Sequence, residues 1–137
     1  MKPKIGLVIS DFNEEITTIM EKAAEKAAKS LRSEVVKKIH VPGAFEIPFA
    51  ANKLLKNKKI NAVAVLGVIA EGETQHDLII GNAISSKLIE LSLKYGKPIG
   101  FGVIGPRVTW EQAKARAEEY AERAVKSALE MCRINSS

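Results

Sequence analysis

The sequence has 137 residues and a mass of 14.9 kDa, which suits one domain over residues 1–137 and excludes two independent cores. Its 46% hydrophobic and 27% charged residues are typical of a globular chain, and the net charge of +5 lacks the aromatic-interleaved basic patch of a nucleic-acid-binding protein. The single cysteine and two histidines argue against a disulfide and a metal centre, and the absence of a long apolar run predicts a cytoplasmic protein with no membrane partner.

Short apolar runs alternate along the chain with longer segments of helical period. Gly96 and Pro98 mark the end of the third helix, and a capping box over 109–112 opens the fourth. The predicted elements are, in chain order, a strand over 4–10, a helix over 16–31, a strand over 34–41, a helix over 46–57, a strand over 61–67, a helix over 76–95, a strand over 98–104 and a helix over 109–133.

Four successive strand–helix units predict an α/β fold in three layers, a four-stranded parallel sheet with helices on both faces. Such a sheet binds ligands outside the carboxyl ends of its strands. In this chain the loops that follow those ends carry aromatic, acidic, glycine and histidine residues. We therefore expect the functional site at that edge.

Two glycine patterns resemble nucleotide-binding loops but lack the required context. Gly100–Gly105 reads G-x-G-x-x-G, yet it lies inside a predicted strand and Pro106 follows it, so we do not expect a dinucleotide cofactor. Gly67–Thr74 has the glycine spacing of a P-loop, but Glu73 occupies the lysine position, which argues against a nucleoside triphosphate. A glycine-bearing loop before a helix suits a small phosphate ester, with a simple turn as the alternative.

The two histidines lead to different expectations. His76 lies at the predicted start of the third helix, two residues from Thr74, where the positive helix end disfavours a second positive charge. A neutral imidazole there could exchange protons near pH 7, with a structural histidine as the alternative. His40 ends a strand without such neighbours, and we expect it to be structural.

Other candidate residues each have a functional and a structural interpretation. Phe12 and Phe45 fall in loops, where they either anchor the loop or offer a platform to a flat ring. Glu46 either favours a helix start or accepts hydrogen bonds from ligand hydroxyls. Arg116 either pairs with Glu119 or Glu122 on its helix or clamps a phosphate.

These residues carry a resemblance that covers nearly the whole chain. The sequence resembles the 6,7-dimethyl-8-ribityllumazine synthases, in a short archaeal-type form. The segments that carry the resemblance are Asp11–Asn13, Val41–Pro48, Gly67–His76, Phe101–Val103 and Glu111–Arg116.

The resemblance implies a flavodoxin-like fold and an enzyme of riboflavin biosynthesis. The implied reaction condenses 5-amino-6-(D-ribitylamino)uracil with 3,4-dihydroxy-2-butanone 4-phosphate, and it releases phosphate and water without a metal or organic cofactor. It also implies that His76 moves protons, that Phe101 comes from a neighbouring subunit and that Arg116 pairs with the phosphate. The implied substrate-binding residues are Phe12, Ala44, Phe45, Glu46, Val68, Ile69, Ala70, Glu73, Thr74, Phe101 and Arg116.

Within that set the resemblance implies a separate role for each part. Phe12 stacks on the pyrimidine, residues 44–46 bind the ribityl chain and ring edge, and residues 68–70 line the other side. Glu73 and Thr74 present backbone N–H groups to the phosphate. The sequence departs from many relatives in having Glu71 in place of an arginine, and residues 117–124 contain no lysine to which the role of the family's last-helix lysine could be assigned.

Two alternatives to this function remain open from the sequence, an archaeal-type riboflavin synthase and a non-catalytic lumazine- or flavin-binding protein. For the assembly we expect a homopentamer with sites between adjacent subunits, with closure of pentamers into an icosahedral shell left open. The argument rests on the apolar character of the last two helices, including alanines at close-packing positions: Ala113, Ala117, Ala121 and Ala124.

Overall fold

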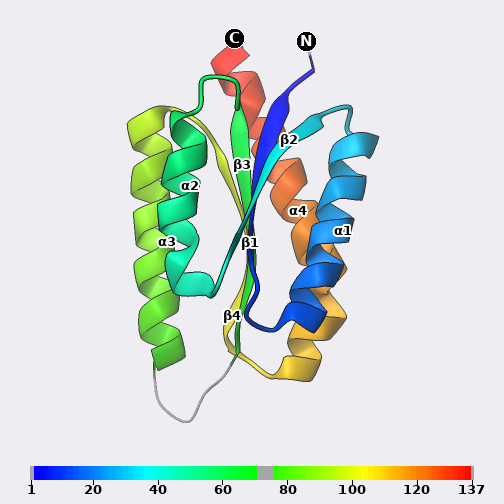
Figure 1. Ribbon diagram of the computed structural model, residues 1–137, viewed down its shortest axis with the longest axis vertical. Helices are drawn as coiled ribbons and strands as arrows, with labels where there is room; N and C mark the ends of the chain where they lie inside the picture. Colours follow the sequence, from blue (N-terminus) through cyan, green and yellow to red (C-terminus); the bar gives the residue numbers. More distant parts are fainter. Residues whose placement is uncertain (1, 71–75, 137) are drawn as a thin grey trace.

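The computed structural model describes residues 2–70 and 76–136, and it contains all four predicted strand–helix units (Figure 1). The elements are β1 (Lys4–Ser10), α1 (Glu14–Ser30), β2 (Glu34–Val41), the short 3₁₀ turn η1 (Ala44–Glu46), α2 (Ile47–Lys56), β3 (Ala62–Ala70), α3 (His76–Tyr95), β4 (Ile99–Val108) and α4 (Trp110–Ser136).

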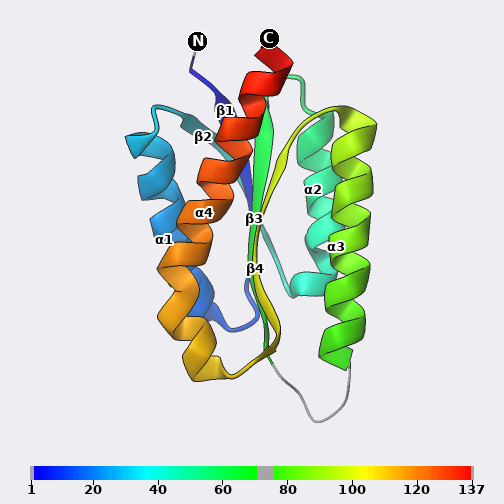
Figure 2. The ribbon, with the colours of Figure 1, turned by 180° about the vertical axis from the view of Figure 1, so that it is seen from behind.

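The sheet has the strand order β2-β1-β3-β4, and every neighbouring pair is parallel. Helices α1 and α4 cover one face, while α2 and α3 cover the other (Figures 1 and 2). The predicted α/β fold with a parallel sheet is therefore confirmed. Both chain termini lie at the amino-terminal edge of the sheet, and the carboxyl ends of the strands lie at the opposite edge (Figure 1).

Alternating side chains of the central strands feed two separate cores. Ile5, Leu7 and Ile9 point to the layer of α1 and α4, whereas Val8 packs with α2 and α3 on the other side. Strand β3 alternates in the same way, and its residues 62–69 are all buried. Burial on both faces is what a central parallel strand requires, and it explains the continuous apolar sequence of β3.

The structure differs from the predicted boundaries mainly at the carboxyl edge. Strand β3 continues past Gly67 to Ala70, and β4 continues past Ile104 to Val108. The two strands stay paired there through Val68 with Ile104 and Ala70 with Val108, across a register shift. Both extensions bring the strand ends closer to the start of α3.

Local signals at the helix ends agree with the prediction. The backbone N–H of Thr109 donates to Gln112 Oε1 at 2.9 Å, and the backbone N–H of Gln112 donates to Thr109 Oγ1 at 3.1 Å. This reciprocal pair is the predicted capping box. Gly96 has a φ of 64° directly after α3, the left-handed conformation that favours glycine at a helix end.

The glycines of the G-x-G-x-x-G segment have a packing role in β4. A side chain at Gly100 would overlap the main chain of Ala124 in α4, and one at Gly102 would lie 3.0 Å from Ala124 Cβ. These glycines let α4 approach the sheet closely, which is a structural reason for the pattern without a dinucleotide.

The alanines of α4 do not lie where the predicted packing between subunits would require them. All four that were expected to serve close packing between subunits are buried within the chain's own core, against α1 and the sheet: Ala113, Ala117, Ala121 and Ala124. They are therefore unavailable to a neighbouring subunit. None of the described helices is long and apolar enough to cross a membrane.

Candidate active site at the carboxyl edge of the sheet

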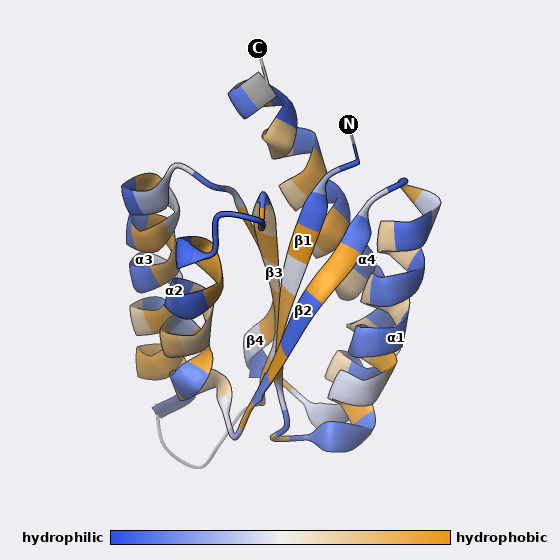
Figure 3. Cartoon of the chain, turned by 45° about the horizontal axis from the view of Figure 1, so that its top comes forward, coloured by the Kyte–Doolittle hydropathy of each residue, from blue (hydrophilic) through white to orange (hydrophobic). Residues whose placement is uncertain are grey.

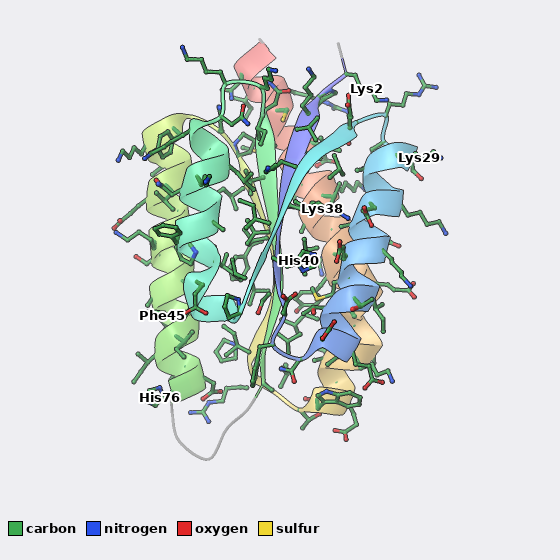
Figure 4. The ribbon with its side chains drawn as sticks, viewed as in Figure 1. Lys2, Lys29, Lys38, His40, Phe45 and His76 are labelled. Atoms are coloured by element: carbon green, nitrogen blue, oxygen red, sulfur yellow. The ribbon has the colours of Figure 1, made fainter. Side chains whose placement is uncertain are left out.

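The carboxyl edge gathers side chains that follow three different strands. Phe12 lies in the turn after β1, Phe45 in η1 after β2, and His76 at the first residue of α3 after β3. Phe12 and Phe45 are 64% and 70% exposed, so neither anchors its loop by burial. Figure 4 places Phe45 and His76 toward this end of the molecule, on the side of α2 and α3.

Backbone bonds shape the turn that carries Phe12. The N–H of Asp11 donates to the carbonyl of Val41 at 2.7 Å, which extends the pairing of β1 with β2 by one residue. Asn13 then adopts a left-handed φ of 66°, and its carbonyl accepts the N–H of Ile16 at 2.9 Å to begin α1. The turn leaves the Phe12 ring outside the core.

The segment after β2 folds back on itself. The N–H of Glu46 donates to the carbonyl of Gly43 at 3.2 Å and closes the 3₁₀ turn. A Cβ at Gly43 would lie 3.3 Å from Glu46 Oε1, so the carboxylate bends over this glycine. Glu46 is partly exposed, and its carboxylate is an acceptor at the edge of the sheet.

The end of β3 offers less side-chain surface than its predicted role suggests. Val68 is buried in the core beneath α1 and α4, and Ile69 is buried in the core beneath α2 and α3. Ala70 is half-buried and is the one of the three whose side chain reaches solvent in the isolated chain.

The start of α3 is tied to the end of β4. Asp77 is buried, and its Oδ2 accepts the backbone N–H of Arg107 at 3.2 Å. Arg107 has a left-handed φ of 67°, and Gly105 has a φ of 106° with its Cα against the carbonyl of Ile69. His76, next to Asp77, is exposed. The predicted phosphate-loop residues Glu73 and Thr74, like Glu71, lie outside the described residues.

Phe101 and Arg116 are not brought to His76 within one chain. Phe101 lies in the edge strand β4, is 43% exposed, and lines two grooves of about 310 and 320 Å³, one toward α3 and one toward α4. Arg116 is exposed on α4, which covers the face of the sheet opposite to α3 (Figure 2). Neither of the glutamates expected as structural partners, Glu119 and Glu122, forms an ion pair with Arg116 among the described residues, and Glu119 pairs with Arg123 instead.

Unpaired polar atoms concentrate at this same edge. In residues 2–70 and 76–136, three buried side-chain atoms lack a hydrogen-bond partner: Ser10 Oγ, Asn13 Nδ2 and Asp77 Oδ1. They belong to the end of β1, the start of α1 and the start of α3. Unsatisfied buried groups are rare in proteins, so these three atoms distinguish the carboxyl edge from the rest of the described core.

A cluster of charged residues around His40 was not expected from the sequence. His40 Nδ1 lies 2.7 Å from Asp11 Oδ1, and His40 Nε2 lies 3.3 Å from Glu21 Oε1. Lys38 Nζ bonds to Glu21 at 2.9 Å and to Glu25 at 3.0 Å. These contacts come from other elements of the fold, and Asp11 directly precedes Phe12. The prediction that His40 is structural stays a prediction. The available signals were the two cations spaced two apart on one strand and the two glutamates spaced four apart on a helix.

Electrostatics follow from these contacts. The hydrogen bond with Asp11 raises the pKa of His40, against the opposing effect of desolvation and with a smaller contribution from Glu21. Hydrogen bonds to Glu21 and Glu25 raise the pKa of Lys38. Among the described residues, no group of three or more His, Cys, Asp or Glu side chains could hold a metal ion.

Comparison with known proteins gives a consistent result over nearly the full length. The family model of 6,7-dimethyl-8-ribityllumazine synthase matches residues 2–136. A 6,7-dimethyl-8-ribityllumazine synthase of Metallosphaera sedula is 45% identical over 130 residues, which cover 95% of this chain and 86% of that protein. One from Methanoculleus marisnigri is 44% identical over 131 residues, with 96% of each chain covered.

A third relative, from Aeropyrum pernix, carries the same description and is 42% identical over 133 residues, covering 96% of this chain and 90% of its own. All three organisms' proteins therefore align along essentially the same length as the family model. The chain belongs to the 6,7-dimethyl-8-ribityllumazine synthase family, the transferases that carry out lumazine synthesis in riboflavin biosynthesis.

Proposed function

We propose that residues 1–137 act as one lumazine synthase domain that condenses 5-amino-6-(D-ribitylamino)uracil with 3,4-dihydroxy-2-butanone 4-phosphate. The products are 6,7-dimethyl-8-ribityllumazine, phosphate and water. The observation that carries the proposal is the common edge of Phe12, Glu46 and His76, each placed after a different parallel strand. A cytoplasmic location stays a prediction from the sequence.

The pyrimidine substrate binds at the turns after β1 and β2 in this proposal. Phe12 stacks on the ring, and its 64% exposure supports that role because the ring is free to receive a partner. Glu46 accepts hydrogen bonds from the ribityl hydroxyls, with Ala44 and Phe45 beside it. Residues 68–70 line the other side, and the burial of the Val68 and Ile69 side chains means that Ala70 and the main chain make the contacts there.

The butanone phosphate binds near the start of α3. Backbone N–H groups of Glu73 and Thr74 hold the phosphate at the positive end of that helix, and Arg116 supplies a guanidinium. Because α4 lies on the other face of the sheet from α3, an Arg116 from one chain and a His76 from the next would together complete a site.

The reaction requires the protein to orient the two substrates, to transfer protons and to bind the phosphate anion. The substrate amine attacks the ketone, and water leaves as an imine forms. Phosphate is then eliminated, and the second amine attacks the remaining carbonyl carbon and closes the ring with loss of a second water. His76 accepts and returns protons during these steps, which is the role of a general acid–base catalyst. Holding the two substrates together accounts for the rest of the acceleration.

We further infer a homopentamer in which Phe101 completes the site of the neighbouring subunit, with a shell of pentamers as a possible higher assembly. Support comes from large apolar side chains on α2 and α3, where Phe49 is 83% and Leu93 79% exposed. Figure 3 shows many hydrophobic residues along α3, while α1 is largely hydrophilic. A face of this kind beside the open edge strand β4 suits a second copy of the chain.

Two measurements test the proposal. Mixing the two substrates with the protein should produce lumazine, followed by its absorbance and fluorescence. An archaeal-type riboflavin synthase would consume lumazine instead, and a non-catalytic binding protein would leave the substrates unchanged. Light scattering should give five times the monomer mass, or a whole multiple of that mass for a shell of pentamers, and a monomer at micromolar concentration would contradict the assembly.

A further inference from the structure

His40 lies between carboxylates from two other elements. Its Nδ1 is 2.7 Å from Asp11 Oδ1 in the turn after β1, and its Nε2 is 3.3 Å from Glu21 Oε1 in α1. Ionised carboxylates only accept hydrogen bonds, and a neutral imidazole has a single N–H. Both contacts are therefore hydrogen bonds only when the ring is protonated and donates from each nitrogen. Figure 4 shows His40 on the side of the sheet that faces α1.

The charges around the ring favour that protonated form. Glu21 and Glu25 of α1, together with Asp11, supply three negative charges. Lys38, which lies on β2 like His40, supplies one positive charge and pairs with Glu21 and Glu25. With a neutral His40 this cluster of four charges has a net charge of −2, and protonation reduces it to −1. Strand β2 is at the edge of the sheet, so no further strand contributes a charge.

The position of His40 connects it to both predicted pyrimidine contacts. Asp11, which its side chain holds, immediately precedes Phe12, and the backbone N–H of Asp11 bonds to Val41, the residue after His40, at 2.7 Å. The chain from Val41 then leads through two residues to Ala44. Two adjacent bonds, from the His40 side chain to Asp11 and from the Asp11 backbone N–H to Val41, thus fix the turn that carries Phe12 to strand β2. The same strand leads into the turn over residues 44–46 that is proposed to bind the ribityl chain.

We propose that the imidazolium of His40 is a positioning residue, which holds Asp11 so that the adjacent Phe12 ring is ordered for stacking on the pyrimidine substrate. The inference rests on the proposed function, because it requires that Phe12 contacts the pyrimidine. The bond between His40 and Asp11 weakens when the imidazole loses its proton, and the Phe12 ring is then less ordered. The affinity of the protein for the pyrimidine substrate therefore falls as the pH rises past the pKa of His40. His76 is untouched by this contact, and kcat should not follow the same titration.

The experiment measures the dissociation constant of 5-amino-6-(D-ribitylamino)uracil between pH 6 and 9 in the parent protein and three variants. His40→Gln removes the titrating charge, and His40→Lys keeps a positive donor over the whole range. Phe12→Ala removes the ring that His40 is proposed to order. The side chain of His40 is 45% exposed, so its substitutions should leave the fold intact, as circular dichroism would verify.

We expect the parent to lose about two- to fivefold in affinity from pH 6 to 9, the scale of an exposed charged pair. His40→Gln should bind at all pH values like the parent at pH 9, His40→Lys like the parent at pH 6, and Phe12→Ala should lose the parent's pH dependence. Ratios of variant to parent cancel any titration of the substrate itself. A His40→Gln profile identical to the parent's would overturn the inference while leaving the proposed function in place. A parent that binds no pyrimidine at any pH would overturn both.

Discussion

Asp77 accepts the backbone N–H of Arg107 through Oδ2 at 3.2 Å, and this bond joins the first turn of α3 to the end of β4. The carboxylate is buried, and Arg107 is held in a left-handed conformation that non-glycine residues rarely adopt. The bond therefore satisfies one backbone donor at the point where β4 leaves the sheet. It also fixes the position of the residue next to His76.

Asp77→Ala should lower both stability and turnover. The substitution leaves the Arg107 N–H without its acceptor, which costs about 1–3 kcal/mol in the free energy of unfolding. Asp77→Asn is the matched control, because its amide oxygen still accepts this bond. Urea unfolding and kcat measure the two effects. Equal losses in the alanine and asparagine variants would show that the charge, and not the bond to Arg107, matters.

Arg32 offers a stability prediction away from the site. It follows α1 with a φ of 58°, and the N–H of Ser33 bonds back to Ala28 at 2.9 Å in the helix-ending arrangement that favours glycine. Arg32→Gly should be more stable than Arg32→Ala by about 1 kcal/mol, because only glycine adopts this conformation without steric cost. Both variants lose the same charge, so the difference in their urea midpoints isolates the backbone effect. A more stable alanine variant would contradict the argument.

Glu46→Gln tests the ribityl contact. The amide keeps the shape of the side chain but loses the charge of the acceptor, at a cost of about 1.5–3 kcal/mol in binding of the pyrimidine substrate. The Michaelis constant for the butanone phosphate should change little. Steady-state kinetics with each substrate varied in turn separates the two. Unchanged pyrimidine affinity would leave Glu46 with its structural role at the start of α2.

Arg116→Ala and His76→Ala should leave different kinetic signatures. Arg116 binds a group that is present before the reaction, so its loss should chiefly raise KM for the butanone phosphate and weaken inhibition by inorganic phosphate. His76 moves protons, so its loss should chiefly lower kcat, by about 10²-fold or less because the free substrates also react without a catalyst.

The control for the Arg116 variant is Arg133→Ala, which removes an exposed arginine near the other end of α4. It should behave like the parent in both constants. If His76→Ala retained the parent's kcat and its dependence on pH, orientation of the substrates alone would account for catalysis, and the proton-transfer role would be withdrawn.

His40 also predicts how stability depends on pH, independently of any substrate. Its pKa is raised in the folded protein, chiefly by Asp11, so folding favours the protonated ring. This contribution is fully present below the pKa of the unfolded state, about 6.5, and it is lost as the pH rises through the folded value. The thermal midpoint of the parent should exceed that of His40→Gln most at pH 5.5 to 6, and the gap should narrow toward pH 9. A constant gap would contradict the linkage.

The sequence predicts the element order well because local signals dominate it. The apolar run of β3, the capping box at Thr109 and the glycine after α3 each depend on residues close to one another in the chain. The ends of β3 and β4 were harder to predict, since their extension to Ala70 and Val108 depends on pairing between the two strands. Pro106 lies inside the extended β4, and this strand tolerates a proline because it is at the edge of the sheet.

The candidate site residues differ in the same way, because some depend on local sequence and others on contacts between distant parts of the chain. Phe12, Glu46 and His76 are recognisable because each follows a predicted strand. The contacts of His40 cannot be predicted in this way, because Asp11 and Glu21 come from other elements and only the folded chain brings them within 3.3 Å of the ring. The bond from Arg107 to Asp77 spans 30 residues and depends on a backbone conformation that composition does not encode.

The two chain termini and the carboxyl edge lie at opposite ends of the sheet (Figure 1). An affinity tag, a fluorescent label or a surface linker attached at either terminus would thus start from the end of the subunit farthest from Phe12 and His76. Immobilising the protein through such a linker would leave the carboxyl edge pointing away from the support. The fold thus separates the termini, where a tag or linker is attached, from the carboxyl edge, where the substrates are proposed to bind.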